Sequence, residues 1–261
     1  MTNYDSLIFE KNGALASIRL NRPKAANGLN ASMARDLRRA AAQCDADTDI
    51  KAVLLSAEGK FFCVGGDLKE LASHNNDSAD MLKRLADDLH AALSTFARMR
   101  APLVVAVNGM AAGAGFSIVA AGDIVVAASG SVFTMAYTKA GLSPDGGSTH
   151  YFPRLIGLRR TQDLMLTNRQ LSAEEALEWG IVTRIAPDET VDEEARAIAE
   201  RLSEGPSEAQ GFVKALLLNS HDTSLESQME LEARSISQCL RSENGQEGVA
   251  AFLEKRAPKF R

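Results

Sequence analysis

The stretch PLVVAVNGMAAGAGFSIVAAGD, residues 102–123, carries the strongest prediction of the fold. Its apolar run LVVAVNG at 103–109 is typical of a short buried strand. The glycine-spaced continuation AAGAGFSIVAAG leads into a helix, and IVVAA at 124–128 predicts the next strand. Buried strands separated by helices predict an α/β fold with crossover connections.

The sequence on the N-terminal side repeats this alternation. Residues 7–20, LIFEKNGALASIRL, predict two short strands around a turn at Asn12-Gly13. A helical pattern follows at 31–44, and AVLLS at 52–56 predicts a buried strand. Residues 78–100 predict a long amphipathic helix, because apolar side chains recur there at helical spacing. They are Leu82, Leu85, Leu89, Leu93 and Phe96.

The C-terminal part has a different character. From Ser172 on, helical segments dominate, with Gly205-Pro206 as a break between them. The predicted helices are 172–179, 191–203 and 224–241. We therefore predict an α/β core over residues 1–200 and a helical C-terminal region over 201–261.

The composition limits the class of protein. The chain has 261 residues, of which 45% are hydrophobic and 24% charged, enough for a sizeable core. No stretch approaches the ~18 apolar residues that span a bilayer, and the N-terminal MTNYDSLIFE lacks the pattern of a secretory signal. Three widely spaced cysteines, Cys44, Cys63 and Cys239, form no disulfide or metal-ligand pattern. We expect a cytoplasmic protein without a bound metal and without a membrane partner.

The net charge of −5 disfavours general affinity for nucleic acid. An anionic ligand must therefore be met by a local group of cations rather than by the field of the whole protein.

Two glycine-containing loops each follow a buried strand: FFCVGGD at 61–67 and NGMAAGAGF at 108–116. In the second, Gly113-Ala114-Gly115 stands where a helix begins, so unpaired N–H groups point outward there. Two such loops brought together would form an oxyanion hole. The alternative is that the glycines only allow tight turns and close packing. A dinucleotide fingerprint fails because Ile118 stands where a third small residue is needed.

Four further blocks, together with 102–123, resemble the crotonase (enoyl-CoA hydratase/isomerase) superfamily in order and spacing. They are NRPKAANGLN (21–30), FFCVGGDLKEL (61–71), EWGIVTRI (178–185) and AFLEKRAPKF (251–260). The resemblance implies a ClpP/crotonase-like spiral of ββα units and a helical C-terminal trimerisation region. It also implies an acyl-CoA substrate, with coenzyme A as part of the thioester and no tightly bound cofactor. The expected assembly is a homotrimer or a dimer of trimers. By position, the N–H groups of Gly66 and Ala114 would form the oxyanion hole.

The same resemblance bears on the reaction. The two glutamates of the hydratases correspond here to Ser117 and Tyr137, neither of which is a good base at neutral pH. In GLSPDGGS, residues 141–148, Asp145 occupies the position of the acid/base of the enoyl-CoA isomerases. By itself, Pro-Asp-Gly-Gly is also an ordinary turn sequence. The resemblance implies an isomerase in which Asp145 removes a proton beside the thioester carbonyl and returns it at a vinylogous carbon.

The presence of His90 is compatible with reactions other than isomerisation. The related 4-chlorobenzoyl-CoA dehalogenase pairs an aspartate at the position of Asp145 with a histidine at that of His90, and IGLRRTQDLMLTNRQL (156–171) also resembles it. That enzyme has a tryptophan in place of Tyr137 and a phenylalanine in place of Gly66. A lone histidine on the flank of an amphipathic helix is otherwise structural or solvated. The remaining alternatives are a hydratase and a non-catalytic acyl-CoA-binding protein.

Three lysines match positions that contact the CoA nucleotide in the family: Lys24, Lys60 and Lys255, the last from a neighbouring subunit. Placed cations are needed because CoA carries phosphates and the protein is acidic. The alternative is that each is a solvated surface lysine.

Overall fold

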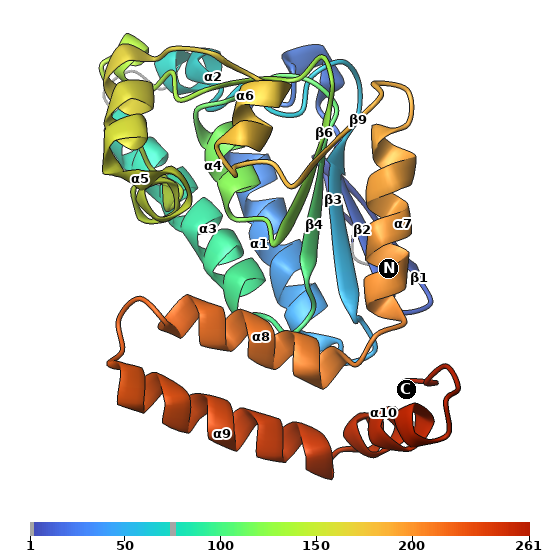
Figure 1. The fold of residues 1–261 in the computed structure, drawn as a ribbon. Helices are drawn as coiled ribbons and strands as arrows, with labels where there is room; N and C mark the ends of the chain where they lie inside the picture. Colours follow the sequence, from blue (N-terminus) through green and yellow to red (C-terminus); the bar gives the residue numbers. More distant parts are fainter. Residues whose placement is uncertain (1–2, 74–76) are drawn as a thin grey trace.

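The computed structural model describes residues 3–73 and 77–261 of the chain. In this part the main sheet has the strand order β1-β2-β3-β4-β6-β9 (Figure 1). β1 and β2 form an antiparallel hairpin, and the later neighbours pair in parallel. The strands are β1 (Leu7–Asn12), β2 (Leu15–Leu20), β3 (Ala52–Ala57), β4 (Leu103–Val107), β6 (Ile124–Ala128) and β9 (Arg184–Ala186).

The hairpin turn differs by one residue from the prediction. Asn12 pairs with Leu15, so the two loop residues are Gly13 and Ala14, not Asn12 and Gly13. Gly13 has a φ of +58°, a conformation that glycine adopts at little cost. The positive φ is therefore needed at the first loop position, and Asn12 remains in the strand.

A second, smaller sheet was not predicted, because its strands are too short for a periodic signal. It has the order β5-β7-β8. The strands are β5 (Ala111–Ala112), β7 (Val132–Thr134) and β8 (Leu171–Ser172). β5 continues the glycine loop that follows β4, so this sheet helps to hold the loop in place.

Side-chain caps mark the start of several helices. The Asn30 side chain accepts the Met33 N–H at 2.9 Å, which satisfies a free donor at the start of α1. Ser172 and Glu175 form a capping box at the start of α6. The helices of the core are α1 (Ala31–Ala46), α2 (Leu68–Ser73), α3 (Ser78–Arg98), α4 (Ala114–Ala120), α5 (Ser148–Thr167), α6 (Ala173–Glu178) and α7 (Val191–Ser203).

Helices cover both faces of the central strands β3, β4 and β6, whose residues are mainly apolar and buried. On β3, Ala52 and Leu54 belong to the cluster formed with α7, whereas Val53 and Leu55 belong to the larger cluster that contains residues of α1, α3 and α4. Figure 1 shows these two layers on either side of the sheet. The arrangement confirms the predicted α/β class with crossover helices.

The C-terminal region extends from this core (Figure 1). It contains α8 (Ser207–Asn219), α9 (Leu225–Arg241) and α10 (Glu243–Leu253). Lys214 fastens α8 to the core: its buried ammonium group donates to the carbonyls of Phe96 and Ala101 and lies 2.6 Å from Asp123 Oδ2. α7 crosses the expected boundary at residues 200 and 201, and the break falls at Gly205, between α7 and α8.

Candidate active site

The two glycine loops lie side by side. Cys63 and Ala111 form a parallel bridge, and the Ala112 N–H donates to the Cys63 carbonyl at 2.9 Å. One step further along, a β-carbon on Gly65 would lie 3.6 Å from Gly113 Cα. The ends of the two loops, which the sequence separates by almost fifty residues, are therefore adjacent.

The glycines of these loops serve two different purposes. A β-carbon on Gly109 would lie 2.2 Å from the Lys60 carbonyl oxygen, and one on Gly115 would lie 2.1 Å from that of Cys63. Side chains are excluded there, so the packing explanation holds for both positions. A β-carbon on Gly66, in contrast, would meet nothing within 4 Å. Gly66 faces open space.

Gly66 and Ala114 each present a free N–H group. Ala114 is the first residue of α4, and neither N–H finds a hydrogen-bond acceptor among the described residues. Both residues line a cavity of about 420 Å³. Two free donors at one cavity wall can stabilise an oxyanion.

The rest of the cavity wall comes mainly from α2, α3 and the segment before α5, and it is largely aliphatic. Asp145 is the only carboxylate among its described lining residues. Its aliphatic members include Leu29, Val64, Leu68, Leu71, Leu82, Leu85 and Leu142.

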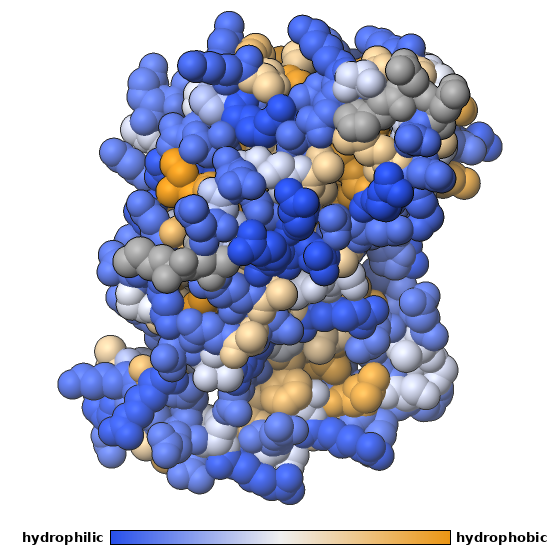
Figure 2. Space-filling model, turned by 180° about the vertical axis from the view of Figure 1, so that it is seen from behind, coloured by the Kyte–Doolittle hydropathy of each residue, from blue (hydrophilic) through white to orange (hydrophobic). Residues whose placement is uncertain are grey.

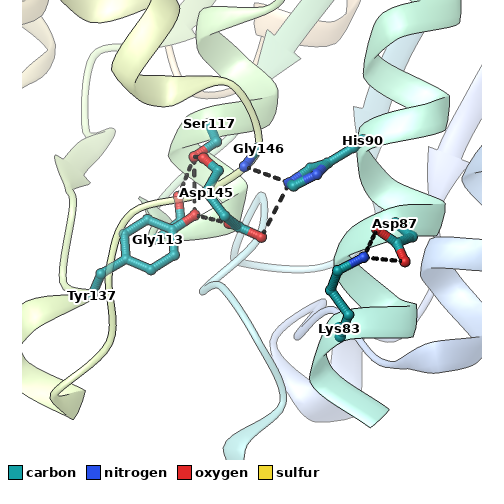
Figure 3. A network of polar contacts seen from close by, with 8 residues as sticks. All are labelled: Lys83, Asp87, His90, Gly113, Ser117, Tyr137, Asp145 and Gly146. Atoms are coloured by element: carbon teal, nitrogen blue, oxygen red, sulfur yellow. Dashed lines mark hydrogen bonds and ion pairs between the residues drawn. The ribbon is translucent and has the colours of Figure 1, made fainter. Parts of the chain in front are cut away.

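Asp145 does not use its carboxylate in the manner of an ordinary turn. The Ser148 N–H donates to the backbone carbonyl of Asp145 at 3.2 Å. The carboxylate instead receives the Tyr137 hydroxyl at 2.5 Å on Oδ1, and its Oδ2 lies 3.5 Å from His90 Nε2 (Figure 3). Positive φ angles at Gly146 and Gly147 turn the chain sharply into α5. One carboxylate oxygen is thus anchored, and the other faces a histidine.

Ser117 and Tyr137 form a hydrogen-bonded network with Asp145. The Ser117 hydroxyl is buried, 3.0 Å from the Tyr137 hydroxyl and 3.0 Å from the Asp145 carbonyl oxygen. Burial and the neighbouring Asp145 raise the pKa of Tyr137, so its phenol remains a donor to the carboxylate. A β-carbon on Gly146 would lie only 2.8 Å from Ser117 Cβ, so the space around Ser117 is tightly filled.

His90 lies on the exposed flank of α3, as its place beside the leucine stripe predicts. Its Nε2 accepts the Gly146 N–H at 3.1 Å (Figure 3). On the same helix, Lys83 lines the cavity and pairs with Asp87 at 2.6 Å. Both partners of that pair are largely exposed, so the pair adds little stability.

Arg22 and Asp67 form a clamp that motif reasoning missed. Arg22 Nη2 donates to Asp67 Oδ2 at 2.9 Å, and Nη1 donates to the Gly28 carbonyl. Burial of Asp67 raises its pKa, but the hydrogen bond and charge of Arg22, together with hydrogen bonds from the backbone N–H groups of Lys69 and Glu70, outweigh burial and lower the pKa. The pair ties the segment before α1 to the residue that follows Gly66. The Asn-Arg-Pro and Gly-Gly-Asp motifs contain both residues, but their contact is visible only in three dimensions.

The structure brings together two of the three predicted CoA-contacting lysines. Lys24 and Lys60 are exposed on adjacent loops, since a β-carbon on Gly59 would lie 2.8 Å from Pro23 Cβ. Lys255 follows α10, which lies at the opposite end of the molecule from α2 (Figure 1), and α2 contributes Leu68 and Leu71 to the cavity lining. A single chain therefore does not bring Lys255 to this site.

Within residues 3–73 and 77–261, no cluster of three or more His, Cys, Asp or Glu side chains has an arrangement suited to a metal ion. In the same ranges, none of the helices combines the length and apolarity needed to cross a membrane.

Comparisons with known proteins identify the family of this chain. The profile of the family described as enoyl-CoA hydratase/isomerase matches residues 10–261. The 1,2-epoxyphenylacetyl-CoA isomerase of Escherichia coli K12 is 36% identical, covering 94% of each chain. A 4-chlorobenzoyl coenzyme A dehalogenase-2 from an Arthrobacter species is 31% identical, covering 94% of this chain and 90% of its own.

A solved structure shows the same fold. The enoyl-CoA hydratase from Polaromonas sp. JS666 superposes with a TM-score of 0.93 at 30% identity, covering 98% of this chain and 99% of the other. Isomerase, dehalogenase and hydratase names thus occur among similar proteins, so the family is shared while the reaction differs. The chain has the crotonase fold and belongs to the enoyl-CoA hydratase/isomerase family, whose enzymes transform acyl-CoA thioesters.

Proposed function

We propose that the protein is an enoyl-CoA isomerase in which Asp145 moves one proton between two carbons of the acyl group. The observation that carries this proposal is that Asp145 is the only carboxylate among the described residues lining the cavity. Hydration of a double bond needs a water to be activated and a proton to be delivered. A double-bond shift needs only one base, because nothing is added or lost.

The geometry supports a specific sequence of events. The thioester oxygen accepts hydrogen bonds from the N–H groups of Gly66 and Ala114, which stabilise negative charge as a proton leaves C2; one such donor is typically worth ~10²–10³ in rate. Asp145 takes the C2 proton on its free oxygen, Oδ2, while Tyr137 holds Oδ1. The protonated Asp145 then returns a proton to C4, and the double bond moves from C3 to C2. The aliphatic wall keeps the carboxylate in a weakly polar setting, which favours proton transfer.

The same proposal includes the binding of CoA. Lys24 and Lys60 would meet its phosphates from one chain, and Lys255 would come from a neighbouring copy in a homotrimer or a dimer of trimers. We place the enzyme in the cytoplasm, where acyl-CoA esters are made and used.

The proposal is tested by a panel of CoA esters followed by thioester absorbance and product mass. A 3-enoyl-CoA is expected to give a conjugated 2-enoyl-CoA of the same mass. A 2-enoyl-CoA is expected to gain no water. Rapid addition of water to the 2-enoyl ester, without isomerisation of the 3-enoyl ester, would overturn the assignment in favour of a hydratase.

A dehalogenase is the second candidate, and the 3.5 Å approach of His90 Nε2 to Asp145 Oδ2 favours it. In that reaction the carboxylate attacks the aromatic ring, chloride leaves, and a histidine activates water to hydrolyse the ester. Two positions speak against this candidate. Tyr137 stands where the dehalogenase has a tryptophan, and its hydroxyl donates to the Asp145 carboxylate. Gly66 stands where the dehalogenase has a phenylalanine, and it leaves open space in the cavity. Release of chloride from 4-chlorobenzoyl-CoA in the same panel would support this candidate.

A further inference from the structure

Asp145 and His90 line two different cavities. Asp145 lines the reaction cavity. His90 and Gly146 line a second cavity of about 360 Å³. Neither Asp145 nor His90 is among the described residues that line the other cavity, yet Nε2 and Oδ2 approach to 3.5 Å (Figure 3). This contact therefore joins a side chain of one cavity to a side chain of the other.

The two cavities differ in chemistry. The reaction cavity is lined mainly by leucine and alanine side chains. The second cavity has charged and polar side chains that can hydrogen-bond water, namely His90, Ser94, Arg98, His150, Asn219 and Asp222. A water molecule takes up ~30 Å³ of liquid volume, so the second cavity has room for several. It is suited to water, whereas the reaction cavity is suited to an acyl chain.

The hydrogen bond from Gly146 fixes which nitrogen of His90 is unprotonated. Nε2 accepts the Gly146 N–H at 3.1 Å, so in this arrangement its lone pair is free of a proton and Nδ1 carries the hydrogen. The His90 side chain is 46% exposed, so it can exchange protons with water. When Asp145 holds a proton on Oδ2, Nε2 lies 3.5 Å from that oxygen.

We infer that His90 is a relay residue through which the proton held by Asp145 exchanges with solvent before it returns to the substrate. Asp145 takes a proton from C2 and becomes a carboxylic acid, and the electron pair moves into the enolate. The Gly146 N–H gives up its hydrogen bond, because Nε2 has a single lone pair, and Oδ2–H then gives its proton to Nε2, which leaves a carboxylate and an imidazolium. The Nε2–H group of the imidazolium exchanges its proton with water. Nε2 then returns a solvent-derived proton to Asp145, which delivers it to C4. This inference rests on the proposed isomerase function.

The inference predicts the origin of the hydrogen at C4. In D₂O, the wild-type enzyme acting on a 3-enoyl-CoA is expected to place deuterium at C4 in most product molecules at low conversion. His90→Gln keeps a polar side chain of related size but removes the base, and it is expected to lower the deuterium fraction per product at least threefold. The product is analysed by NMR and mass spectrometry. A merely structural role for His90 would lower turnover and leave this fraction unchanged.

His150→Gln is the matched control, because His150 also lines the second cavity but has no contact with Asp145 among the described residues. It is expected to keep the wild-type deuterium fraction. Wild-type product without solvent deuterium would overturn the inference. So would a His90→Gln variant that incorporates deuterium to the same extent as wild type.

A saturated acyl-CoA separates this inference from the proposed function, since its C2 hydrogens can exchange while no double bond can move. Loss of C2 exchange in His90→Gln but not in His150→Gln supports the relay even if no 3-enoyl-CoA is isomerised. Isomerisation without uptake of solvent deuterium removes the relay and leaves the isomerase. The absence of both isomerisation and C2 exchange in the wild type removes both.

Discussion

The core buries its large apolar side chains, whereas the last C-terminal helices leave theirs exposed. In the core, strands are covered on both faces, and Phe62, Phe116 and Phe152 have no exposed surface. α9 has no buried residue at all, and Ile236 on it is 72% exposed. Figure 2 shows apolar patches on the lower part of the molecule, where the C-terminal helices lie.

This difference indicates that one chain forms the candidate site by itself but leaves the apolar surface of the C-terminal helices uncovered. Asp145, Tyr137 and the loops with Gly66 and Ala114 meet within a single copy. The C-terminal helices have apolar side chains without a partner in that copy; burying each in an interface would contribute ~1.5–3 kcal/mol. We therefore expect a second copy to cover them. The exposed apolar residues of the last two helices are Leu225, Met229, Leu231, Ile236, Leu240, Val249, Phe252 and Leu253.

The largest expected effect lies in the core. Asp145→Asn preserves the shape of the side chain but removes the base, so kcat for isomerisation should fall by about 10²–10⁴-fold. Binding of a CoA ester, measured by calorimetry, should change little. Asp87→Asn is the control: Asp87 pairs with Lys83 on exposed α3 surface, and its loss should change kcat less than about threefold. Near-normal turnover by Asp145→Asn would contradict the assignment.

The next effect tests the C-terminal helices. Ile236→Glu places a charge in the exposed apolar surface of α9 and should reduce the mass in solution from an oligomer to a single chain, because a buried unpaired charge is costly. Light scattering with size-exclusion chromatography measures this mass. Gln238→Glu adds the same charge two residues away and should leave the assembly intact. A wild-type protein that is monomeric would show that these side chains need no second copy.

Two glycine variants compare a tightly packed position of the core with an open one. Gly115→Ala forces a β-carbon against the Cys63 carbonyl, and overpacking of this kind costs about 1–3 kcal/mol. For a chain of this size, the melting temperature should fall by roughly 2–10 °C. In Gly66→Ala the new methyl group points into open space, so the melting temperature should change by no more than about 1 °C. The same methyl group should raise KM. Circular dichroism measures the melting temperatures. An equal change in melting temperature for both variants would contradict the distinction between a glycine needed for packing and a glycine that faces the site.

The smallest effect concerns Tyr137. Its pKa in the folded protein is raised above the value of 10.0 for a free tyrosine. Above pH 10 the unfolded chain therefore loses the proton that the folded chain keeps, and the free energy of unfolding falls as pH rises, by at most about 1.4 kcal/mol per pH unit. Tyr137→Phe should show a shallower fall between pH 10 and 11 in urea titrations. An identical slope in both proteins would show that the Tyr137 hydroxyl is not held in its protonated form.

Local patterns predicted much of the fold because they report on burial. The helices at 31–44, 78–100, 191–203 and 224–241 are present, with ends that differ by two residues or fewer. The strands of two or three residues could not be predicted, since their pairing depends on distant segments. α5 was also missed: it contains Pro153, and Gly157 interrupts it with a φ of +78°.

The candidate site shows the same difference between what local motifs predict and what depends on contacts between distant segments. Motif positions indicated Asp145, Gly66 and Ala114 as site residues, and the structure brings all three to one cavity. The motifs did not indicate that Tyr137 would anchor the carboxylate, nor that Arg22 would hold Asp67. Such contacts depend on side-chain distances across separate segments.

The sequence by itself determined the α/β class, the order of most of the longer strands and helices, and the family motifs, because burial and turn formation constrain the residue types of each local segment. Only the tertiary structure decided that Gly115 packs while Gly66 stays open. It also decided the geometry of the His90–Asp145 pair, in which Nε2 accepts the Gly146 N–H and lies 3.5 Å from Asp145 Oδ2. The physical reason is that hydrogen bonds and close packing act over a few ångströms in space, and only the folded chain brings distant residues within that range.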